Sequence, residues 1–355
     1  DAERAVIAVG ATFSTAGTHP PVMSTAYAVY EDALYVVDTA RESLVREQPF
    51  DSRTECVAVT DGTLLVGTFE DGLQRSTDDG QSWTRAADIE QDAVTSLAVD
   101  PEDPATVYAG TEPSRVYRST DGGQAFERLP GLTDLDSADE WSFPPRPNTH
   151  HVRWIEPDPA DPDLLHVAVE AGALLRARLG DDGVDWTDRV PSGRRDTHTI
   201  ATHPDAPGRA WVAAGDGYAE SSDAGESWQH PQAGLDHTYC WSVAVGLDRA
   251  STGLSTPRVL LSSATSAREA HRVGESYLYR RKGGAWERLD DRGIPTGEGV
   301  YRAILERGAD EATFWAANNH GLYCTDDGGD SWSPVDATFP DRIGDQTCRG
   351  LVIVD

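Results

Sequence analysis

The sequence predicts an all-β protein, a seven-bladed β-propeller built from four-stranded antiparallel blades. Two observations lead to this prediction. A motif of the form Ser/Thr-x-Asp-x-Gly-x-x-Trp recurs along the 355 residues, and short runs rich in β-branched and aromatic residues flank its copies. The aromatic position of the motif returns after 43, 60, 42, 58 and 46 residues, which gives a basic period of about 42 with two insertions. This period is typical of one propeller blade.

The motif itself is expected to form a turn between the third and fourth strands of a blade. Its hydroxyl and carboxylate can bond backbone groups that lack ladder partners, and its glycine permits a positive φ. Its Trp is expected to pack between neighbouring blades, so we assign no motif residue to a functional site. Four copies are intact: Ser76, Asp78, Gly80 and Trp83; Ser119, Asp121, Gly123 and Phe126; Ser221, Asp223, Gly225 and Trp228; Thr325, Asp327, Gly329 and Trp332. Two copies are eroded and keep Asp181, Gly183 and Trp186, or only Gly283 and Trp286.

The strand patterns place six blades in order along the chain. Each blade reads as four short apolar runs separated by Gly, Pro and Asp. Blade two shows the pattern at residues 94–99, 106–110, 116–119 and 126–129. The six blades are expected near 54–88, 92–131, 150–191, 194–234, 237–293 and 299–340.

The seventh blade is expected to be composite, made of residues 1–49 and 345–355. The segment from Cys348 to Val354 reads as its inner strand, and those from Arg4 to Gly10 and from Ala33 to Asp38 read as later strands. Pairing of the two chain ends closes the ring and removes exposed sheet edges. Residues 1–355 are therefore expected to form a single domain.

The repeated motif resembles the Asp-box, or BNR repeat, of sialidase-like, sortilin-like and photosystem-assembly propellers. A closer resemblance is to uncharacterised bacterial and archaeal propellers labelled glycosyl hydrolase BNR repeat. As in those proteins, a strand of the form His-Val-Arg-Trp-Ile-Glu-Pro-Asp-Pro (151–159) is followed one blade later by a strand with an internal His (197–201). The resemblance implies the fold and not a chemistry. The photosystem-assembly propellers present an arginine patch that binds protein.

The composition is strongly acidic. Sixty Asp and Glu residues oppose thirty Lys and Arg, and Lys282 is the one lysine, so the net charge is −30. This pattern resembles the proteins of salt-accumulating halophilic archaea, where molar salt screens self-repulsion; the alternative is an ordinary acidic protein from a GC-rich organism. The charge argues against general nucleic-acid binding, which needs clustered positive charge.

Other features point to a location and an oligomeric state. No run of 18 apolar residues exists, so we expect no membrane association. We expect the cytoplasm of a salt-accumulating organism. The sequence shows no leader, and a leader removed before Asp1 would make the protein secreted. We expect a monomer without a cofactor. The four cysteines, Cys56, Cys240, Cys324 and Cys348, show no metal-ligand spacing. Three of them, Cys56, Cys240 and Cys348, lie on expected inner strands, so we expect buried thiols, which favour the cytoplasm.

Alignment of the inner strands gives the candidate site. The first position of each inner strand is expected at the mouth of the central channel, where the seven positions form a ring. If these residues had only a structural role, we would expect small or apolar side chains. The seven positions are Glu55, Thr95, Arg153, His198, Trp241, Arg302 and Arg349. Nearby residues add His150, His151, Asp196, His237, Tyr239 and Tyr301. The predicted ligand-binding residues are Arg153, Arg302, Arg349, His198, Trp241, His151, Tyr239 and Glu55.

Three long loops are expected on the same face, since loops that enter inner strands and loops between second and third strands share one side of a propeller. They run from Thr12 to Ser24, over 132–149 with Trp141 and Phe143, and over 265–274 with Arg268 and His271. Long loops on a rigid scaffold commonly carry binding sites. We expect Trp141 and Phe143 to form an aromatic wall or lid.

Three arginines at one mouth suit an anionic ligand, because guanidinium groups bind carboxylate or phosphate with paired hydrogen bonds. The first hypothesis is a non-catalytic propeller that binds an acidic sugar, a small carboxylate or phosphate, or an acidic peptide. The alternative without a ligand is that each arginine forms ion pairs with carboxylates such as Glu55, Glu156 and Glu306 along a solvated channel.

The second hypothesis is a sialidase-like glycoside hydrolase or lyase that acts on an acidic sugar. Arg153, Arg302 and Arg349 are similar to the arginine triad of sialidases, with Tyr301 or Tyr239 as nucleophile and Glu55 or Asp196 in support. His198 is a further catalytic candidate. The chain departs from that family in lacking an Arg-Ile-Pro motif and in having seven expected blades instead of six.

Two further alternatives stay open. The protein is a protein-interaction or assembly scaffold if the arginines point away from a common pocket. A divalent metal held by two or three histidines is the alternative to having no metal, since neutral imidazole suits Zn²⁺ and related ions. The histidines concerned are His150, His151, His198 and His237.

Overall fold

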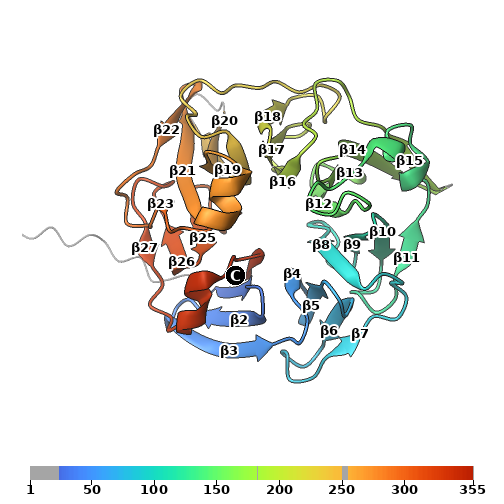
Figure 1. Cartoon of the computed structure of the whole chain (residues 1–355), viewed down its shortest axis with the longest axis horizontal. Coiled ribbons are helices and arrows are strands. Elements are labelled where there is room, and N and C mark those ends of the chain that lie inside the picture. Colours follow the sequence, from blue (N-terminus) through green and yellow to red (C-terminus); the bar gives the residue numbers. More distant parts are fainter. Residues whose placement is uncertain (1–23, 182, 250–254, 355) are drawn as a thin grey trace, which may run out of the picture.

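The computed structural model describes residues 24–181, 183–249 and 255–354, and it shows a seven-bladed β-propeller. Seven antiparallel sheets stand around a central channel, with their strands numbered outward from it in most blades (Figure 1). The predicted fold class is confirmed. The helices of the described residues are short and lie in loops: η1 (Leu132–Asp134), η2 (Ala138–Glu140), η3 (Glu269–Val273) and η4 (Asp341–Asp345). None of these helices has the length and apolarity needed to cross a bilayer.

The first three contiguous blades each have four strands in simple order. They comprise β4 (Thr54–Thr60), β5 (Thr63–Thr68), β6 (Leu73–Ser76) and β7 (Thr84–Arg85); β8 (Ala93–Val99), β9 (Val107–Glu112), β10 (Val116–Ser119) and β11 (Glu127–Leu129); and β12 (Val152–Asp158), β13 (Asp161–Val169), β14 (Ala173–Gly180) and β15 (Gly183–Thr187). In each blade the first strand is the one nearest the channel.

The next three blades vary this plan. The fourth contiguous blade has three strands, and an isolated bridge between Glu220 and Gln229 stands in place of a fourth. The fifth has an extra short strand, β23, which pairs with β21. Their strands are β16 (Thr197–Ala201), β17 (Ala210–Ala214) and β18 (Gly217–Ser221); β19 (Tyr239–Arg249), β20 (Ser255–Ala264), β21 (Glu275–Lys282), β22 (Ala285–Arg288) and β23 (Gly297–Glu298); and β24 (Ile304–Arg307), β25 (Phe314–Asn318), β26 (Gly321–Thr325) and β27 (Ser333–Pro334).

The two ends of the chain close the ring, as predicted. The last strand, β28 (Gly350–Val354), pairs with β1 (Thr25–Val29) and is followed by β2 (Ala33–Asp38) and β3 (Ser43–Pro49). Val354 lies opposite Thr25, and Gly350 lies opposite Val29. Residues 33–38 form a strand as expected, whereas the strand at 25–29 was not expected. The predicted strand from Arg4 to Gly10 lies outside the described residues.

The hydrophobic core lies between adjacent blades. Trp211 of β17, Val243 of β19 and Tyr279 of β21 belong to one buried cluster that joins two blades. Trp286 packs in the same cluster, and its indole N–H donates to the Pro231 carbonyl at 2.9 Å. The aromatic residues of the repeated motif therefore join blades, as the sequence predicted.

The repeated motif forms the same turn in each intact copy. The Ser76 hydroxyl donates to Asp78 at 2.8 Å and accepts the Gly80 N–H at 2.9 Å. Asp78 also accepts the backbone N–H of Ser82 at 2.9 Å and the Ser82 hydroxyl at 2.6 Å. Gly80 has a φ of 79°, which its missing Cβ permits. These side chains close the turn, as expected, and are not free for chemistry.

Candidate functional site

Local backbone geometry explains how the ring of side chains reaches the channel mouth. A register shift interrupts five inner strands at the aligned position itself: Glu55, Thr95, Arg153, His198 and Trp241. A β-bulge leaves one residue out of the ladder and redirects its side chain. Of the other two ring positions, Arg349 immediately precedes the inner strand β28, and Arg302 lies two residues before the inner strand β24. The alignment therefore identified positions where the backbone frees a side chain.

Two cavities meet at this ring. A mouth cavity of about 180 Å³ opens on one face, and a central channel of about 420 Å³ runs between the inner strands. Both cavities touch Thr95, Arg153, Trp241 and Arg349, so these residues lie between mouth and channel. The mouth cavity is lined by Arg53, Glu55, Phe69, Thr95, Phe143, Pro145, Arg146, His151, Arg153, Glu170, Trp241, His271, Arg302 and Arg349.

Arg302 is the most unusual group of the mouth. Its side chain is 5% exposed, and its guanidinium carbon lies 4.3 Å from the centre of a Trp241 ring. It donates to the Thr347 hydroxyl at 2.9 Å, and no carboxylate of the described residues forms an ion pair with it. Burial, and then the charges of Arg349 and Arg153, lower the pKa of Arg302 to about 9. This arginine is a buried cation without a counter-ion among the described residues.

The other two arginines have distant partners. Arg349 lies 3.4 Å from Glu55 and 3.4 Å from Glu31. Arg153 lies 3.6 Å from Glu170, and its guanidinium carbon is 4.9 Å from the centre of a Trp241 ring. The pairing alternative therefore describes Arg153 and Arg349 in part, but it does not describe Arg302.

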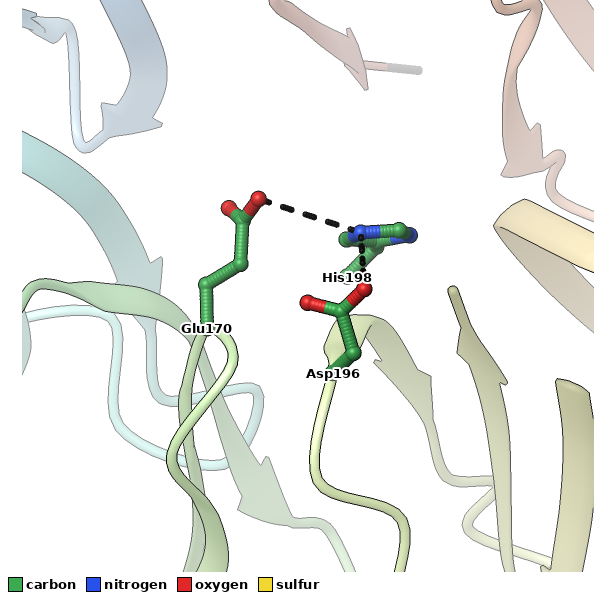
Figure 2. Close-up of side chains that lie close together, drawn as sticks. All are labelled: Glu170, Asp196 and His198. Carbon is green, nitrogen blue, oxygen red and sulfur yellow. Dashed lines mark ion pairs between the residues drawn. The ribbon is translucent and has the colours of Figure 1, made fainter. Parts of the chain in front are cut away.

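A group of carboxylates and imidazoles adjoins the arginines. Glu170 lies 2.9 Å from His151 Nε2 and 3.8 Å from His198 Nε2, while Asp196 lies 3.9 Å from His198 Nε2 (Figure 2). Burial opposes ionisation of Glu170, but the hydrogen bond from His151 and the charges of His151, His198 and Arg153 outweigh it and lower its pKa.

The position of Asp196 depends on a glycine. A Cβ atom on Gly215 would lie 2.0 Å from Asp196 Oδ2, so any other residue there would displace the carboxylate. Asp196 also accepts the Ala171 N–H at 3.1 Å. Burial raises the pKa of Asp196, and the nearby charge of His198 opposes that rise.

A tyrosine and a histidine form a second layer beside Trp241. The Tyr239 hydroxyl lies 2.7 Å from His271 Nε2 and 3.5 Å from His198 Nε2. Burial, and then the charges of Arg302 and His198, lower the pKa of His271 to about 3, so its imidazole is neutral. Burial raises the pKa of Tyr239. The segment 265–274, which carries His271 on η3, reaches the mouth as predicted, whereas Arg268 is exposed and pairs with Glu269.

The segment 132–149 supplies one wall of the mouth. Phe143 lines the cavity and meets the His151 ring edge-on at 4.8 Å. Trp141, expected in the same wall, is 5% exposed and belongs to a hydrophobic cluster instead. The Trp141 side chain is buried because the segment between η2 and β12 packs it against strands β12, β13 and β14. Of the third long segment, Thr12 to Ser24, only Ser24 lies within the described residues.

Several candidate residues do not line the mouth cavity. His198 and Tyr239 contact residues that do, which are Trp241 and His271. Tyr301, His150 and His237 are also absent from its lining. Tyr301 does not line it; its backbone N–H donates to Asn319, and its ring lies beside Gly274. His150 meets the Trp141 ring edge-on at 5.5 Å. His237 stacks on Tyr277 at 3.9 Å. Of the four histidines, only His151 and His198 share a partner, which is Glu170.

Several mouth residues were not predicted from the sequence, although a signal for them existed. Residues two positions before the ring form a second tier, which contains Arg53 and His151. Across the hairpin, Phe69 donates its N–H to Arg53, and Glu170 donates its N–H to His151. The residue two positions before each ring position, together with its partner on the second strand of the blade, predicts Phe69 and Glu170 as mouth residues.

Comparisons with known proteins show the fold. No family model matches the chain. An ancestral GH74 enzyme matches with a TM-score of 0.60 and 14% identity, covering 80% of this chain and 38% of the enzyme. YCF48 bound to D1 peptide matches with a TM-score of 0.54 and 17% identity, covering 80% of this chain and 82% of that one.

A curated protein matches a short segment. The probable oligoxyloglucan-reducing end-specific xyloglucanase of Neosartorya fischeri is 32% identical over 74 residues, which is 19% of this chain and 9% of that protein. The chain thus spans a small part of the xyloglucanase and little more than a third of the GH74 enzyme. It shares the propeller fold with GH74 and YCF48 proteins.

Proposed function

We propose that this propeller binds an anionic ligand at its mouth cavity without catalysing a reaction. The ligand is an acidic sugar, a small carboxylate or phosphate, or an acidic peptide. The observation that carries the proposal is Arg302, a buried guanidinium with no carboxylate partner among the described residues. An uncompensated buried charge costs several kcal/mol. An anion in the mouth supplies the missing charge.

The neighbours of Arg302 suit the same ligand. Arg153 and Arg349 hold their carboxylates at 3.4–3.6 Å, longer than the usual length of about 2.8 Å for such charge-assisted bonds, so both can turn toward an incoming anion. Trp241 offers an aromatic surface between Arg153 and Arg302. A cavity of about 180 Å³ accepts a small ligand or the end group of a longer one.

The fold comparison supports a binding role in one respect. YCF48 matches this chain over 82% of its own length, and its structure is described as bound to a peptide. A single propeller of this size can thus serve as a binding module. An acidic peptide terminus would present the carboxylate that the three arginines suit.

A hydrolase or lyase that acts on an acidic sugar is the second candidate. The Tyr239 hydroxyl and the neutral imidazole of His271 are hydrogen-bonded at the mouth, which gives a pair able to transfer a proton beside the arginines. The likeness to a GH74 enzyme and the short xyloglucanase match agree with a hydrolase of this kind, although xyloglucan itself is a neutral sugar polymer. Neither tyrosine lines the mouth cavity, but the Tyr239 hydroxyl contacts the lining residue His271, so Tyr239 is the better tyrosine for such a role.

A thermal-shift screen tests the proposed function. The wild-type protein, in molar KCl with EDTA, is melted with sialic and uronic acids, phosphosugars and acidic peptides. A ligand at a hundredfold excess over its Kd stabilises the folded state by about 2.7 kcal/mol, which raises the Tm visibly. We expect a carboxylate or phosphate ligand to raise the Tm of wild type and not that of the double variant Arg302→Ala with Arg349→Ala.

The matched control is Arg268→Ala, which removes an exposed arginine from the same loop-rich face. This variant should keep the full ligand shift. An undiminished shift in the double variant contradicts the proposal. No shift with any ligand favours a scaffold that binds another macromolecule. Turnover of a ligand that does bind, abolished by Tyr239→Phe, favours the enzyme.

A further inference from the structure

Three electron-rich atoms converge beside the mouth cavity. His198 Nε2 faces one oxygen of Glu170 at 3.8 Å and one oxygen of Asp196 at 3.9 Å, and the ligand atoms of the three residues lie within 4.8 Å of one another (Figure 2). Glu170 comes from the end of β13, and the other two come from the start of β16. His198 is fully buried, and Glu170 is 7% exposed.

The orientation of the histidine is fixed from its other nitrogen. His198 Nδ1 lies 2.7 Å from the Cys240 carbonyl oxygen. A carbonyl oxygen only accepts hydrogen bonds, so Nδ1 carries a hydrogen. In the neutral ring, Nε2 then has a lone pair, and that lone pair points at the two carboxylates.

No strong donor of the described residues satisfies this lone pair. The nearest hydroxyl is that of Tyr239, at 3.5 Å from His198 Nε2. That hydroxyl has one hydrogen and lies closer to His271 Nε2, at 2.7 Å. When the His198 ring is neutral, two carboxylates and a ring lone pair face one another in a buried place, and either a metal ion or a proton on Nε2 offsets their repulsion.

We propose that Glu170, Asp196 and His198 bind one divalent transition-metal ion. Bonds of about 2.0–2.2 Å from such an ion to nitrogen and oxygen let two ligand atoms lie at most about 4.3 Å apart. The two separations that involve His198, 3.8 and 3.9 Å, meet this limit as they stand. A mixed imidazole and carboxylate set suits Mn²⁺ or Zn²⁺, whereas Ca²⁺ and Mg²⁺ prefer oxygen alone.

The surroundings match a metal site in a second respect. A metal-bound histidine usually donates its remaining ring N–H to a carbonyl or carboxylate, which sets the tautomer. The Cys240 carbonyl has this role for His198. Gly215 leaves room for Asp196 where a Cβ would collide with the carboxylate.

Glu170 connects the ion to the arginines. One oxygen faces His198, and the other lies 2.9 Å from His151 and 3.6 Å from Arg153. An ion held by the first oxygen lies one carboxylate away from Arg153, and its remaining coordination positions are available to an anion in the mouth. This last step rests on the proposed function, and the binding of the ion does not.

The test is a titration of the protein with Mn²⁺ alone, followed by electron paramagnetic resonance, in molar KCl without any anionic ligand. Free Mn²⁺ gives a strong signal that falls on binding. We expect one tight ion per chain, and binding at least tenfold weaker in Asp196→Asn and in Glu170→Gln. The control is Asp216→Asn, which removes an equal charge next to Gly215 but outside the three residues; it should bind as wild type does.

A spin-echo measurement on the wild-type complex gives a readout that needs no variant. Coupling of bound Mn²⁺ to an imidazole nitrogen is expected. Weak binding at many sites, equal in all variants and without nitrogen coupling, overturns the proposal and assigns the cation to a proton on His198. Because this titration contains no carboxylate or phosphate ligand and the ligand screen contains EDTA, failure of the ion site and failure of the anion site are distinguishable.

Discussion

At the residue scale, the presence of Arg302 is not explained by a contribution to stability. A buried arginine normally has a carboxylate beside it, since a desolvated charge is otherwise costly. Arg302 instead has two further arginines nearby, and their charges add to the effect of burial in lowering its pKa. Such a residue is better explained by the ligand it binds than by the fold it supports.

We therefore predict that Arg302→Met stabilises the ligand-free protein while it abolishes anion binding. Methionine fills the space beside Trp241 without the buried charge, and the expected gain is about 1–3 kcal/mol. Differential scanning calorimetry measures the change as a higher Tm. Arg268→Met, at a 71% exposed side chain, should change stability by less than about 0.5 kcal/mol. A lower Tm for Arg302→Met would show that its bond to Thr347 has a structural role that outweighs the charge.

The individual site residues were predictable to different degrees. Arg153, Arg302 and Arg349 followed from strand alignment, because equivalent positions in equivalent blades face the same axis. Which of them has a partner could not be predicted, since that depends on how far each side chain lies from Glu55 or Glu170. The choice between Tyr301 and Tyr239 likewise depends on the path of the loop that carries His271.

At the element scale, the repeated turn shows how side chains replace missing ladder bonds. In the turn after β18, the buried Ser221 hydroxyl accepts the Gly225 N–H at 2.9 Å and donates to Asp223 at 2.7 Å. Asp223 then accepts the N–H of Ser227 at 2.9 Å. Each turn thus depends on one buried hydroxyl and on one exposed carboxylate.

We predict that Ser221→Ala destabilises the protein by about 1–3 kcal/mol, because the buried Gly225 N–H loses its acceptor. Thermal or urea unfolding followed by circular dichroism measures the loss. Ser227→Ala removes an exposed hydroxyl from the same carboxylate and should cost less than about 0.5 kcal/mol. Equal effects of the two substitutions contradict the idea that burial of the hydroxyl decides its contribution.

The presence of the strands was easier to predict than their register and bounds. The motif and the period located the blades, because each turn marks the end of a third strand. The bulges at the ring positions were not visible in the sequence, since a bulge is a change of register between two strands. The strand at 25–29 was not predicted; it pairs with β2, which follows it in the sequence, and with β28 at the far end of the chain.

At the scale of the whole molecule, the candidate site exists only in the closed ring. Arg153 belongs to the blade of β12, Arg302 precedes β24, and Arg349 precedes β28, whose pairing with β1 joins the two ends of the chain. No single blade brings these arginines together. The ring also gathers positive charge at one mouth of a chain whose net charge is −30, so the mouth differs in sign from the average surface.

The channel below the mouth brings together carboxylates from different blades. Glu156 of β12 and Glu306 of β24 both line it. Burial raises the pKa of Glu156 to about 7. Burial, and then the charge of Glu156, raise the pKa of Glu306 to about 8 from an ordinary value of 4.5. Glu156 has hydrogen bonds from Thr202 and Trp154 that favour its ionised form, so Glu306 keeps its proton to the higher pH.

This difference gives a pH dependence with a definite sign. Between pH 4.5 and about 8 the unfolded chain has lost the Glu306 proton while the folded protein retains it, so stability falls as the pH rises through this window. Glu306→Gln removes that fall. We predict that its free energy of unfolding equals that of wild type near pH 4.5 and exceeds it at pH 8 by an amount on the order of 1–2 kcal/mol, because channel water reduces the full effect. A higher Tm at pH 8 measures this difference. Glu127→Gln, at an exposed position on β11, should follow the wild-type curve at every pH. Parallel curves for Glu306→Gln and wild type would mean that channel water solvates the Glu306 carboxylate and that its pKa is not raised in the folded protein.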